Sequence, residues 1–436
     1  MNSDERRAAR RERRERKRAE NRAKRIEGLD LERVASMDAL YDAAMKAKRG
    51  VSWKGSVQRY CLHALANVCK ARRDLLRGED IRRGFHEFDI IERGKRRHIS
   101  SVHFSERVIH KSLSVNALVP AIMPTLTAGN SANMKGRGVD YAIDRLKKQL
   151  ARHYRRHGTE GYVLLVDFSD YFARIDHDAS KALVRRALDD ERLIELTDSL
   201  IDACGDVGLG LGSEPNQILA VSLPNPIDHW AEEMAGLEAT GRYMDDSYYI
   251  DMSKEKLRLV LACIEILCDD LGITINRKKT RIVKLSRGFR FLKKRLYYGP
   301  TGKVVVRPSR ESITRERRKL KAMRRMLDRG EIAIEQINQS YQSWRGGMLR
   351  LDAHDTVLSM DRLFSELFRE CPPPPVTEIG SPRLSVLASF VGGAPRIVWD
   401  ASTVAVMSPR RTIGTAGGLL PRVSIGAAVT PSAAPS

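Results

Sequence analysis

Two stretches of sequence decide the fold: YVLLVDF at residues 162–168 and RYMDDSYYIDM at residues 242–252. The first is a short apolar run that ends on Asp167, and it is typical of a strand buried on both faces. The second has apolar segments on either side of Asp245 and Asp246, so it predicts a strand, a tight turn and a second strand. If these strands are neighbours in one sheet, the aspartates meet at one edge.

Carboxylates at such an edge have a restricted set of chemical roles. A carboxylate that ends a buried strand must be hydrogen-bonded, paired or metal-bound, and adjacent carboxylates repel each other unless a cation neutralises them. Converging carboxylates are suited to two Mg²⁺ ions about 3.5–4 Å apart, for which Mn²⁺ can substitute, and this arrangement serves phosphoryl transfer. Taken singly, each Asp has an ordinary explanation because Asp favours turns.

The charge of the chain indicates a polyanionic partner. In 436 residues, Lys and Arg number 77 against 55 for Asp and Glu, which gives a formal net charge of +22. Nucleic acid is the first candidate and an anionic membrane surface the second. We expect no membrane partner, because the sequence has no apolar run of about 18 residues. The length predicts two or three domains.

The cysteines and the N-terminus predict a compartment. The six Cys are scattered without a CxxC pair, which indicates reduced thiols, and no apolar stretch follows the charged N-terminus. We therefore expect a cytoplasmic protein. Residues 1–25 are Arg-rich and almost without apolar side chains, so they predict either a solvated helical arm or a segment that stays disordered until it binds phosphates.

Several further blocks occur in order around the aspartates. They are RGKRRHISSVHFSERVIHKSL (93–113), MKGRGVDYAIDRL (134–146), VDFSDYFARIDH (166–177), GLGLGSEPNQILAVSLPNPIDHW (208–230), INRKKTRIV (275–283), RGFRFLKKRLYYG (287–299) and SYQSWRGGM (340–348). Together with YMDD, they resemble the blocks of prokaryotic reverse transcriptases over roughly residues 55–368. The resemblance is specific because it rests on a series of blocks.

The resemblance implies a fold and a division of the chain. The fold class is α/β, with an α+β palm, in a right-hand polymerase with fingers, palm and helical thumb. The expected parts are a basic arm (1–28), N-terminal helices and fingers (29–160), the palm with the catalytic carboxylates (161–300), the helical thumb (301–371), and a Pro-rich linker and weakly ordered tail (372–436).

The resemblance also implies which residues hold the metals. Asp167 and Asp245 are the expected bridging ligands, with Asp246 in a supporting role, and the carbonyl of Phe168 completes a coordination sphere. Phe172, five residues after Asp167, would lie under the sugar and exclude a 2′-hydroxyl, because an apolar ring cannot hydrogen-bond it. Ordinary core packing is the alternative role for this ring.

Other residues are expected to contact the nucleotide or to support its site. Lys95 and Arg97 would reach the triphosphate, and Arg107 would brace the fingers. Gln217 would lie beside the nascent base pair, and Lys279 would lie near the departing pyrophosphate or, equally, on a solvated face. Tyr341 and Trp344 are expected in the thumb core.

The predicted function is RNA-directed DNA polymerisation by two-metal nucleotidyl transfer. Its partners would be an RNA template, a primer, the cDNA and dNTPs, with a companion non-coding RNA or accessory protein possible. The resemblance extends to enzymes of diversity-generating retroelements, of antiviral defence and of retron or group II intron type; Asn216 stands where the first of these carry Ser. The alternatives are an RNA-templated RNA polymerase or primase on the same palm, and a non-catalytic basic RNA-binding protein.

Overall fold

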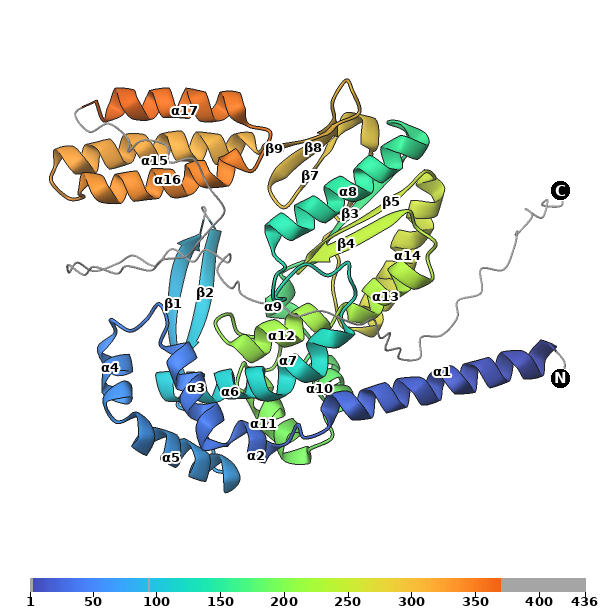
Figure 1. Cartoon of the computed structure of the whole chain (residues 1–436), viewed down its shortest axis with the longest axis vertical. Helices are drawn as coiled ribbons and strands as arrows, with labels where there is room; N and C mark the ends of the chain where they lie inside the picture. The colour runs from blue at the N-terminus through green and yellow to red at the C-terminus, as the bar shows by residue number, and fades with distance from the viewer. Residues whose placement is uncertain (1–2, 93–94, 370–436) are drawn as a thin grey trace, which may run out of the picture.

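The structure is a computed structural model that describes residues 3–92 and 95–369. Within these residues the fold is α+β, with small antiparallel sheets set among many helices (Figure 1). The mixed helix and strand content predicted from the sequence is confirmed. No helix in the described ranges is long and apolar enough to cross a membrane.

A four-stranded sheet lies at the centre. It contains β3 (Tyr162–Asp167), β4 (Ala239–Tyr243), β5 (Asp246–Asp251) and β6 (Arg281–Lys284), in the order β4-β5-β3-β6. All of its neighbouring strands are antiparallel. The prediction that the two deciding stretches form neighbouring strands is confirmed, because β3 pairs directly with β5.

The alternation of side chains along β3 divides the apolar residues between two cores. Leu164 and Val166 belong to the core on the face covered by α14 (Lys254–Asp270), and Val163 and Leu165 belong to the core on the opposite face. A strand buried on both faces needs apolar residues at every position, which explains the continuous run.

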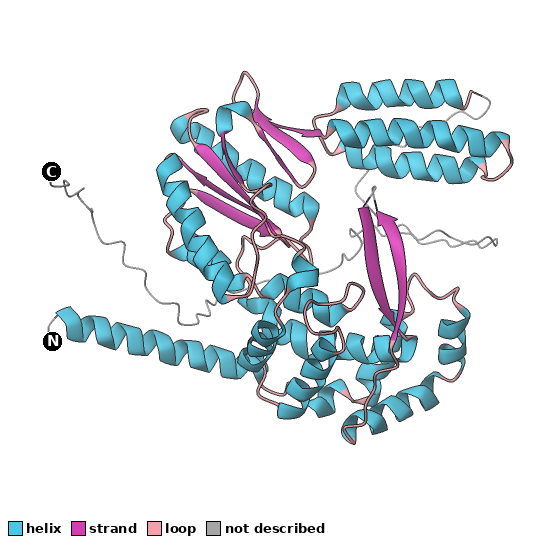
Figure 2. Cartoon of the chain, turned by 180° about the vertical axis from the view of Figure 1, so that it is seen from behind, coloured by secondary structure: helices cyan, strands magenta, loops and turns pink. Residues whose placement is uncertain are grey.

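The helix α8 (Val139–His157) covers the second face of the sheet (Figure 2). Its residues Ile143, Leu146 and Leu150 lie in the core that contains Val163. This helix falls in the range 29–160 predicted for the N-terminal helices and fingers, yet it packs on the central sheet. Its basic, amphipathic sequence carries no signal that says which neighbour it covers.

The N-terminal part is helical. Helix α1 (Ser3–Ile26) extends away from the rest of the chain (Figure 1), so of the two forms expected for the arm the structure has the helix. The following elements are α2 (Leu31–Val34), α3 (Met37–Ala47), α4 (Gly55–Leu62), α5 (Ala64–Leu76), α6 (Phe104–Leu113), a π-helical turn (Ser114–Leu118), α7 (Val119–Ile122) and a 3-10 turn (Met123–Thr125).

The sequence predicts a hairpin with one strand at FHEFDII (85–91), a turn at Gly94-Lys95 and a second strand from Arg97 to Phe104. A hairpin is present between α5 and α6. Strands β1 (Phe85–Glu92) and β2 (Lys95–Val102) pair antiparallel, with Glu92 opposite Lys95. The connecting residues 93–94 lie outside the described ranges. The second strand ends earlier than the predicted Phe104, because Phe104 begins α6 and is buried in the core.

Five helices lie between the strands β3 and β4 in sequence. They are α9 (Tyr171–Arg174), α10 (His177–Ala187), α11 (Glu191–Asp202), α12 (Glu214–Ser222) and α13 (Asn225–Glu233). The sequence predicts a helical stretch over 215–235 that is interrupted near Pro224 and Pro226. This interruption is confirmed, because α12 ends at Ser222 and Pro224 caps α13. Proline lacks an amide hydrogen and fits only the first turn of a helix.

After the turn at Asp245 and Asp246 the sequence predicts a short strand at Ile273–Ile275 and a strand near 288–298, and both predictions are wrong. The first is reduced to an isolated bridge between Ile275 and Phe168. The predicted strand at 288–298 is divided into β7 (Phe289–Phe291) and β8 (Lys294–Tyr298) by a turn in which Leu292 and Lys293 have positive φ. Strand β9 (Val304–Pro308), which the sequence analysis lacked, pairs with β8 across the predicted boundary at residue 300.

The last described elements form a three-helix bundle with its own core. Helices α15 (Arg310–Asp328), α16 (Ile334–Leu349) and α17 (His354–Leu367) bury Leu320, Ile337, Tyr341, Met360, Phe364 and Phe368 between them. The core role predicted for Tyr341 is confirmed, since its ring stacks on Phe364 at 4.3 Å. The residues predicted as linker and tail, with a short strand at 396–399, lie outside the described ranges.

Candidate active site

The pairing of β3 with β5 brings the predicted aspartates together. In the register of these strands Asp167 lies opposite Asp246. Asp245 lies in the tight turn between β4 and β5, and Met244, the residue before it, has a left-handed φ of 55°. The amide of Phe168 donates a hydrogen bond to the carbonyl of Asp245 at 3.3 Å. This bond fixes the turn against the end of β3.

The carboxylates crowd negative charge at a partly buried edge. Burial raises the pKa of Asp246 to about 7, and the neighbouring carboxylates of Asp245 and Asp167 contribute to this rise. Lys279 opposes this charge: its Nζ donates to both carboxylate oxygens of Asp167, at 2.7 and 2.9 Å. This hydrogen bond raises the pKa of Lys279. The prediction left Lys279 between a site role and a solvated face, and the structure places it on the aspartate cluster.

A cavity of about 280 Å³ opens beside the cluster. Asp167, Asp246 and Lys279 line one part of it, and Arg281, Arg290 and Lys293 line the rest together with apolar residues of β3 and β7. Carboxylates surrounded by cationic side chains can hold divalent ions and a polyphosphate at the same time. The geometry therefore suits a phosphorylated ligand with bound metal.

A buried ion pair supports the turn between β4 and β5 from the interior of the protein. Arg242 and Asp228 have side chains only 1% and 7% exposed. The Nε of Arg242 lies 2.9 and 3.0 Å from the two carboxylate oxygens of Asp228, and its Nη2 lies 2.6 Å from one of them. Arg242 also donates to the carbonyls of Met244, at 3.0 Å, and Val221, at 2.8 Å. One guanidinium thus joins β4, the turn at Met244, α12 and α13.

The sequence analysis missed this pair, although a signal for it exists. Arg242 is the one charged residue of the short strand ATGRY (239–243) before the turn, and a charge at a buried position needs a partner. The partner cannot be found from local sequence, because Asp228 lies 14 residues earlier, on the helix α13. The backbone of Arg242 also forms two hydrogen bonds with the segment around Asn130, which pairs with it in an isolated bridge.

The residues predicted to contact the nucleotide lie on elements next to the sheet. Phe168 is buried and its ring lies 5.3 Å from that of Tyr171. Phe172, on α9, is half-buried against the main core, and its carbonyl accepts a hydrogen bond of 2.7 Å from the amide of Leu209. Gln217 is half-buried on α12. The loop before α12 therefore connects Phe172, the predicted sugar contact, to Gln217, the predicted contact of the base pair.

The hairpin is attached to the same loop. The amide of Ser100, in β2, donates to the carbonyl of Leu211 at 3.2 Å. Lys95 and Arg97 belong to β2, but their side chains lie outside what the structure describes. Their predicted contact with a triphosphate therefore stays a prediction.

Helix α6, which follows the hairpin in sequence, is joined to α12 through charged side chains. Burial lowers the pKa of Arg107, and the nearby carboxylate of Glu214 opposes this shift. Lys111 forms an ion pair with Glu214 at 2.8 Å. Since Glu214 begins α12, these contacts link the helix after the hairpin to the helix that carries Gln217.

Comparison with solved structures gives a distant likeness. The chain is similar to apo telomerase from Candida tropicalis, truncated from its C-terminal domain, with 15% sequence identity and a TM-score of 0.39. The match covers 52% of this chain and 55% of the telomerase chain. No protein-family model matches the sequence, and no curated protein matches it.

The buried ion pair of Arg242 and Asp228 predicts that single and double substitutions lower the free energy of unfolding by very different amounts. Asp228→Ala leaves the buried Arg242 without its partner and should lower the free energy of unfolding by about 3–5 kcal/mol. Combining Asp228→Leu with Arg242→Met removes both charges and should recover much of that loss. Urea denaturation measures both. The control is Glu311→Ala, which breaks the exposed ion pair with Arg290 and should change stability by less than about 1 kcal/mol. Equal losses in the single and double variants would contradict this account.

The crowded carboxylates predict a pH-dependent stability in metal-free protein. The folded pKa of Asp246, about 7, lies above its ordinary value of 3.8, so ionisation destabilises the fold as pH rises between these values. Asp246→Asn should therefore be more stable than the wild type by on the order of 2–4 kcal/mol at pH 8, and by almost nothing near pH 4. Denaturation in EDTA across this range measures the difference. Asp270→Asn, at an exposed position of α14, should show no such trend.

Proposed function

We propose that this protein is an RNA-directed DNA polymerase that extends a primer by metal-dependent nucleotidyl transfer. The observation that carries the proposal is the position of Asp167 opposite Asp246, with Asp245 in the adjoining turn. Of the blocks that resemble reverse transcriptases, those at 166–177, 242–252 and 275–283 contribute residues to this sheet or adjoin it. A non-catalytic RNA-binding protein has no need for three ionisable carboxylates at a cost in stability.

The residues fit a pair of Mg²⁺ ions. Asp246 is held with a raised pKa by burial and by two like charges, and Lys279 already places a cation against both oxygens of Asp167. Asp167, Asp245, Asp246 and the carbonyl of Phe168 are the groups that would hold the ions. Bound there, the ions would activate the primer 3′-hydroxyl and stabilise the leaving pyrophosphate.

The side chains around the ions have separate tasks. Lys279 would release Asp167 when the ions bind, and its ammonium would then face the departing pyrophosphate. Arg290 and Lys293, in the cavity wall, would neutralise the triphosphate beside Lys279. Lys95 and Arg97 would approach the triphosphate from the hairpin. Together these groups would orient the nucleotide for attack.

The arrangement of the elements supports a right-hand layout. The central sheet would be the palm, the β1–β2 hairpin with its helices the fingers, and α15–α17 the thumb. Figure 1 shows the hairpin and the bundle on the same side of the sheet, with the hairpin directed toward the bundle. Exposed basic residues of α15 would follow the primer–template backbone; they are Arg310, Arg315, Arg317, Arg318, Lys321 and Arg325.

The choice of DNA product rests on Phe172. A half-buried ring that follows the catalytic strand by one turn of helix can pack under the sugar and desolvate a 2′-hydroxyl. An RNA-templated RNA polymerase or primase needs space for that hydroxyl. The proposed cytoplasmic location rests on the scattered cysteines and the charged N-terminus. The bacterial source and the biological role, whether diversity generation or antiviral defence, rest on the resemblance.

The proposal predicts that Asp245→Asn abolishes dNTP incorporation on an RNA template with Mg²⁺. Losing one carboxylate removes several kcal/mol of transition-state stabilisation, so the rate should fall by about 10³-fold or more. Primer extension measures the rate, and circular dichroism checks the fold. Asp270→Asn serves as the control. Activity close to that of the wild type in Asp245→Asn would refute the site.

The role of Phe172 predicts a change in sugar selection. Phe172→Ala should lower the ratio of kcat/KM for dNTP over rNTP by about 10-fold or more, because the ring no longer excludes the 2′-hydroxyl. The neighbouring Tyr171→Phe is the control: its hydroxyl bonds the carbonyl of Ala220 and points into the core. An unchanged ratio in Phe172→Ala would assign the ring to core packing alone.

The arm predicts a salt-dependent interaction with RNA. The described part of α1 is rich in exposed Arg and has few apolar residues, so it can neutralise phosphates and release their counterions. Deleting residues 1–20 should leave extension of a short primer–template at low salt largely intact. Affinity for a long structured RNA should fall, and log Kd should depend less steeply on log salt, by about one unit for each phosphate that the arm neutralises. An unchanged slope would show that the arm is only solvated.

A further inference from the structure

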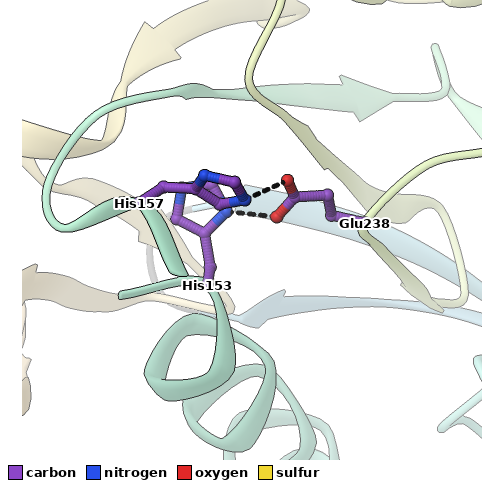
Figure 3. A group of neighbouring side chains, drawn as sticks. All are labelled: His153, His157 and Glu238. Atoms are coloured by element: carbon purple, nitrogen blue, oxygen red, sulfur yellow. Dashed lines mark hydrogen bonds and ion pairs between the residues drawn. The ribbon is translucent and has the colours of Figure 1, made fainter. Parts of the chain in front are cut away.

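A cluster of metal-ligating side chains lies apart from the aspartates. His153 and His157 are four residues apart at the C-terminal end of α8, so both lie on one face of the helix. Glu238 immediately precedes β4 and points between the two rings (Figure 3). The Nδ1 of His153 lies 2.5 Å from one oxygen of Glu238, and the Nε2 of His157 lies 2.8 Å from the other.

The hydrogen bonds of His153 leave its Nδ1 facing the carboxylate of Glu238. Its Nε2 lies 2.7 Å from the carbonyl of Glu160, which can only accept, so this nitrogen carries a hydrogen. In a neutral imidazole the Nδ1 then presents a lone pair. That lone pair faces a carboxylate oxygen at 2.5 Å, a contact that becomes favourable when the two atoms share a proton or when both bind a metal cation.

We propose that His153, His157 and Glu238 bind a divalent transition-metal cation of the Zn²⁺ class. Two imidazole nitrogens and a carboxylate are a ligand set that zinc uses, with the fourth position left to water. A ligating His normally donates its other N–H to a carbonyl or carboxylate, which fixes the ring and its tautomer. The bond from His153 to the carbonyl of Glu160 provides this support.

The surroundings hold one ligand rigidly and leave the others accessible. The side chain of His153 is 1% exposed, and a Cβ at Gly161 would lie only 3.0 Å from its Cε1 and Nε2. The chain therefore needs glycine at position 161, which also has a positive φ of 98°. The side chains of His157 and Glu238 are 31% and 21% exposed, so an ion and a water can reach the cluster from solvent.

The bound cation would fasten α8 to the edge of the central sheet. Strand β4 is an edge strand, and Glu238 lies at its beginning. A second contact runs in parallel, because the side-chain amide of Gln149 donates to the carbonyl of Thr240 at 3.1 Å. The cation would add coordination bonds between these elements, so its role is structural and does not depend on the proposed polymerase activity.

Cobalt binding to the full-length, metal-free protein tests the proposal. Excess Mg²⁺ is kept present so that hard-ion sites are filled, and Co²⁺ is followed by its visible d–d absorption, with Zn²⁺ as competitor. We expect one equivalent of tetrahedral Co²⁺ with a Kd of about 1 µM or tighter and no sulfur charge-transfer band, which separates the cluster from the cysteines. Zn²⁺ should displace the Co²⁺ and raise Tm.

Matched variants test whether the bound Co²⁺ occupies the cluster of His153, His157 and Glu238. His157→Ala and Glu238→Gln are chosen because these side chains are partly exposed and their loss spares the buried His153. Each should lose the Co²⁺ spectrum and the rise in Tm. The control is His229→Ala, which removes an imidazole paired with Glu233 at the same four-residue spacing on α13. Absence of tight Co²⁺ binding in the wild type, or its retention in both cluster variants, would overturn the proposal and leave a proton between His153 and Glu238.

Discussion

The buried contact between Arg242 and Asp228 is the constraint on which the candidate site depends. The guanidinium satisfies Asp228 with three hydrogen bonds and donates two more to the carbonyls of Met244 and Val221. The backbone of the turn is therefore held from the interior, by a group that itself cannot move without leaving a charge unpaired in the core. This arrangement explains how Asp245 and Asp246 can stay close to Asp167 although the three side chains repel one another.

The electrostatics of the site follow from the fact that Arg242 holds the turn through its backbone and not through its carboxylates. The turn is fixed by its backbone, and the carboxylates of Asp167 and Asp246 line the cavity, where burial and the like charges of Asp245 and Asp167 raise the pKa of Asp246. Lys279, in the segment before β6, neutralises part of that negative charge through its hydrogen bond to Asp167. Such a cluster is unfavourable for the apo fold and becomes favourable when cations bind, which is the behaviour expected of a functional site and the opposite of a structural ion-pair network.

Local patterns were sufficient for much of this fold. The apolar run of β3, the turn between β4 and β5, the hairpin and the break at Pro224 were predicted because each depends on neighbouring residues. Long-range packing decided the rest. Strand β9 forms by pairing with β8, and α8 covers the sheet. Ile275 makes only an isolated bridge, because its partner Phe168 comes after the end of β3. The site divides in the same way. The aspartates could be predicted from strand ends, whereas Asp228 and the His–His–Glu cluster join residues that are distant in sequence.

The edge strand β4 connects these observations. It is five residues long and pairs with a strand on one side only, so main-chain pairing alone would hold it weakly. Its beginning is tied to α8 through Glu238 and the two histidines, and its end is tied to α13 through Arg242. Both ties reach the strand through side chains of helices on different sides of the sheet. The position of Asp245 and Asp246 therefore depends on two helices as much as on the sheet, and a displacement of either helix would reach the carboxylates through only a few residues of strand.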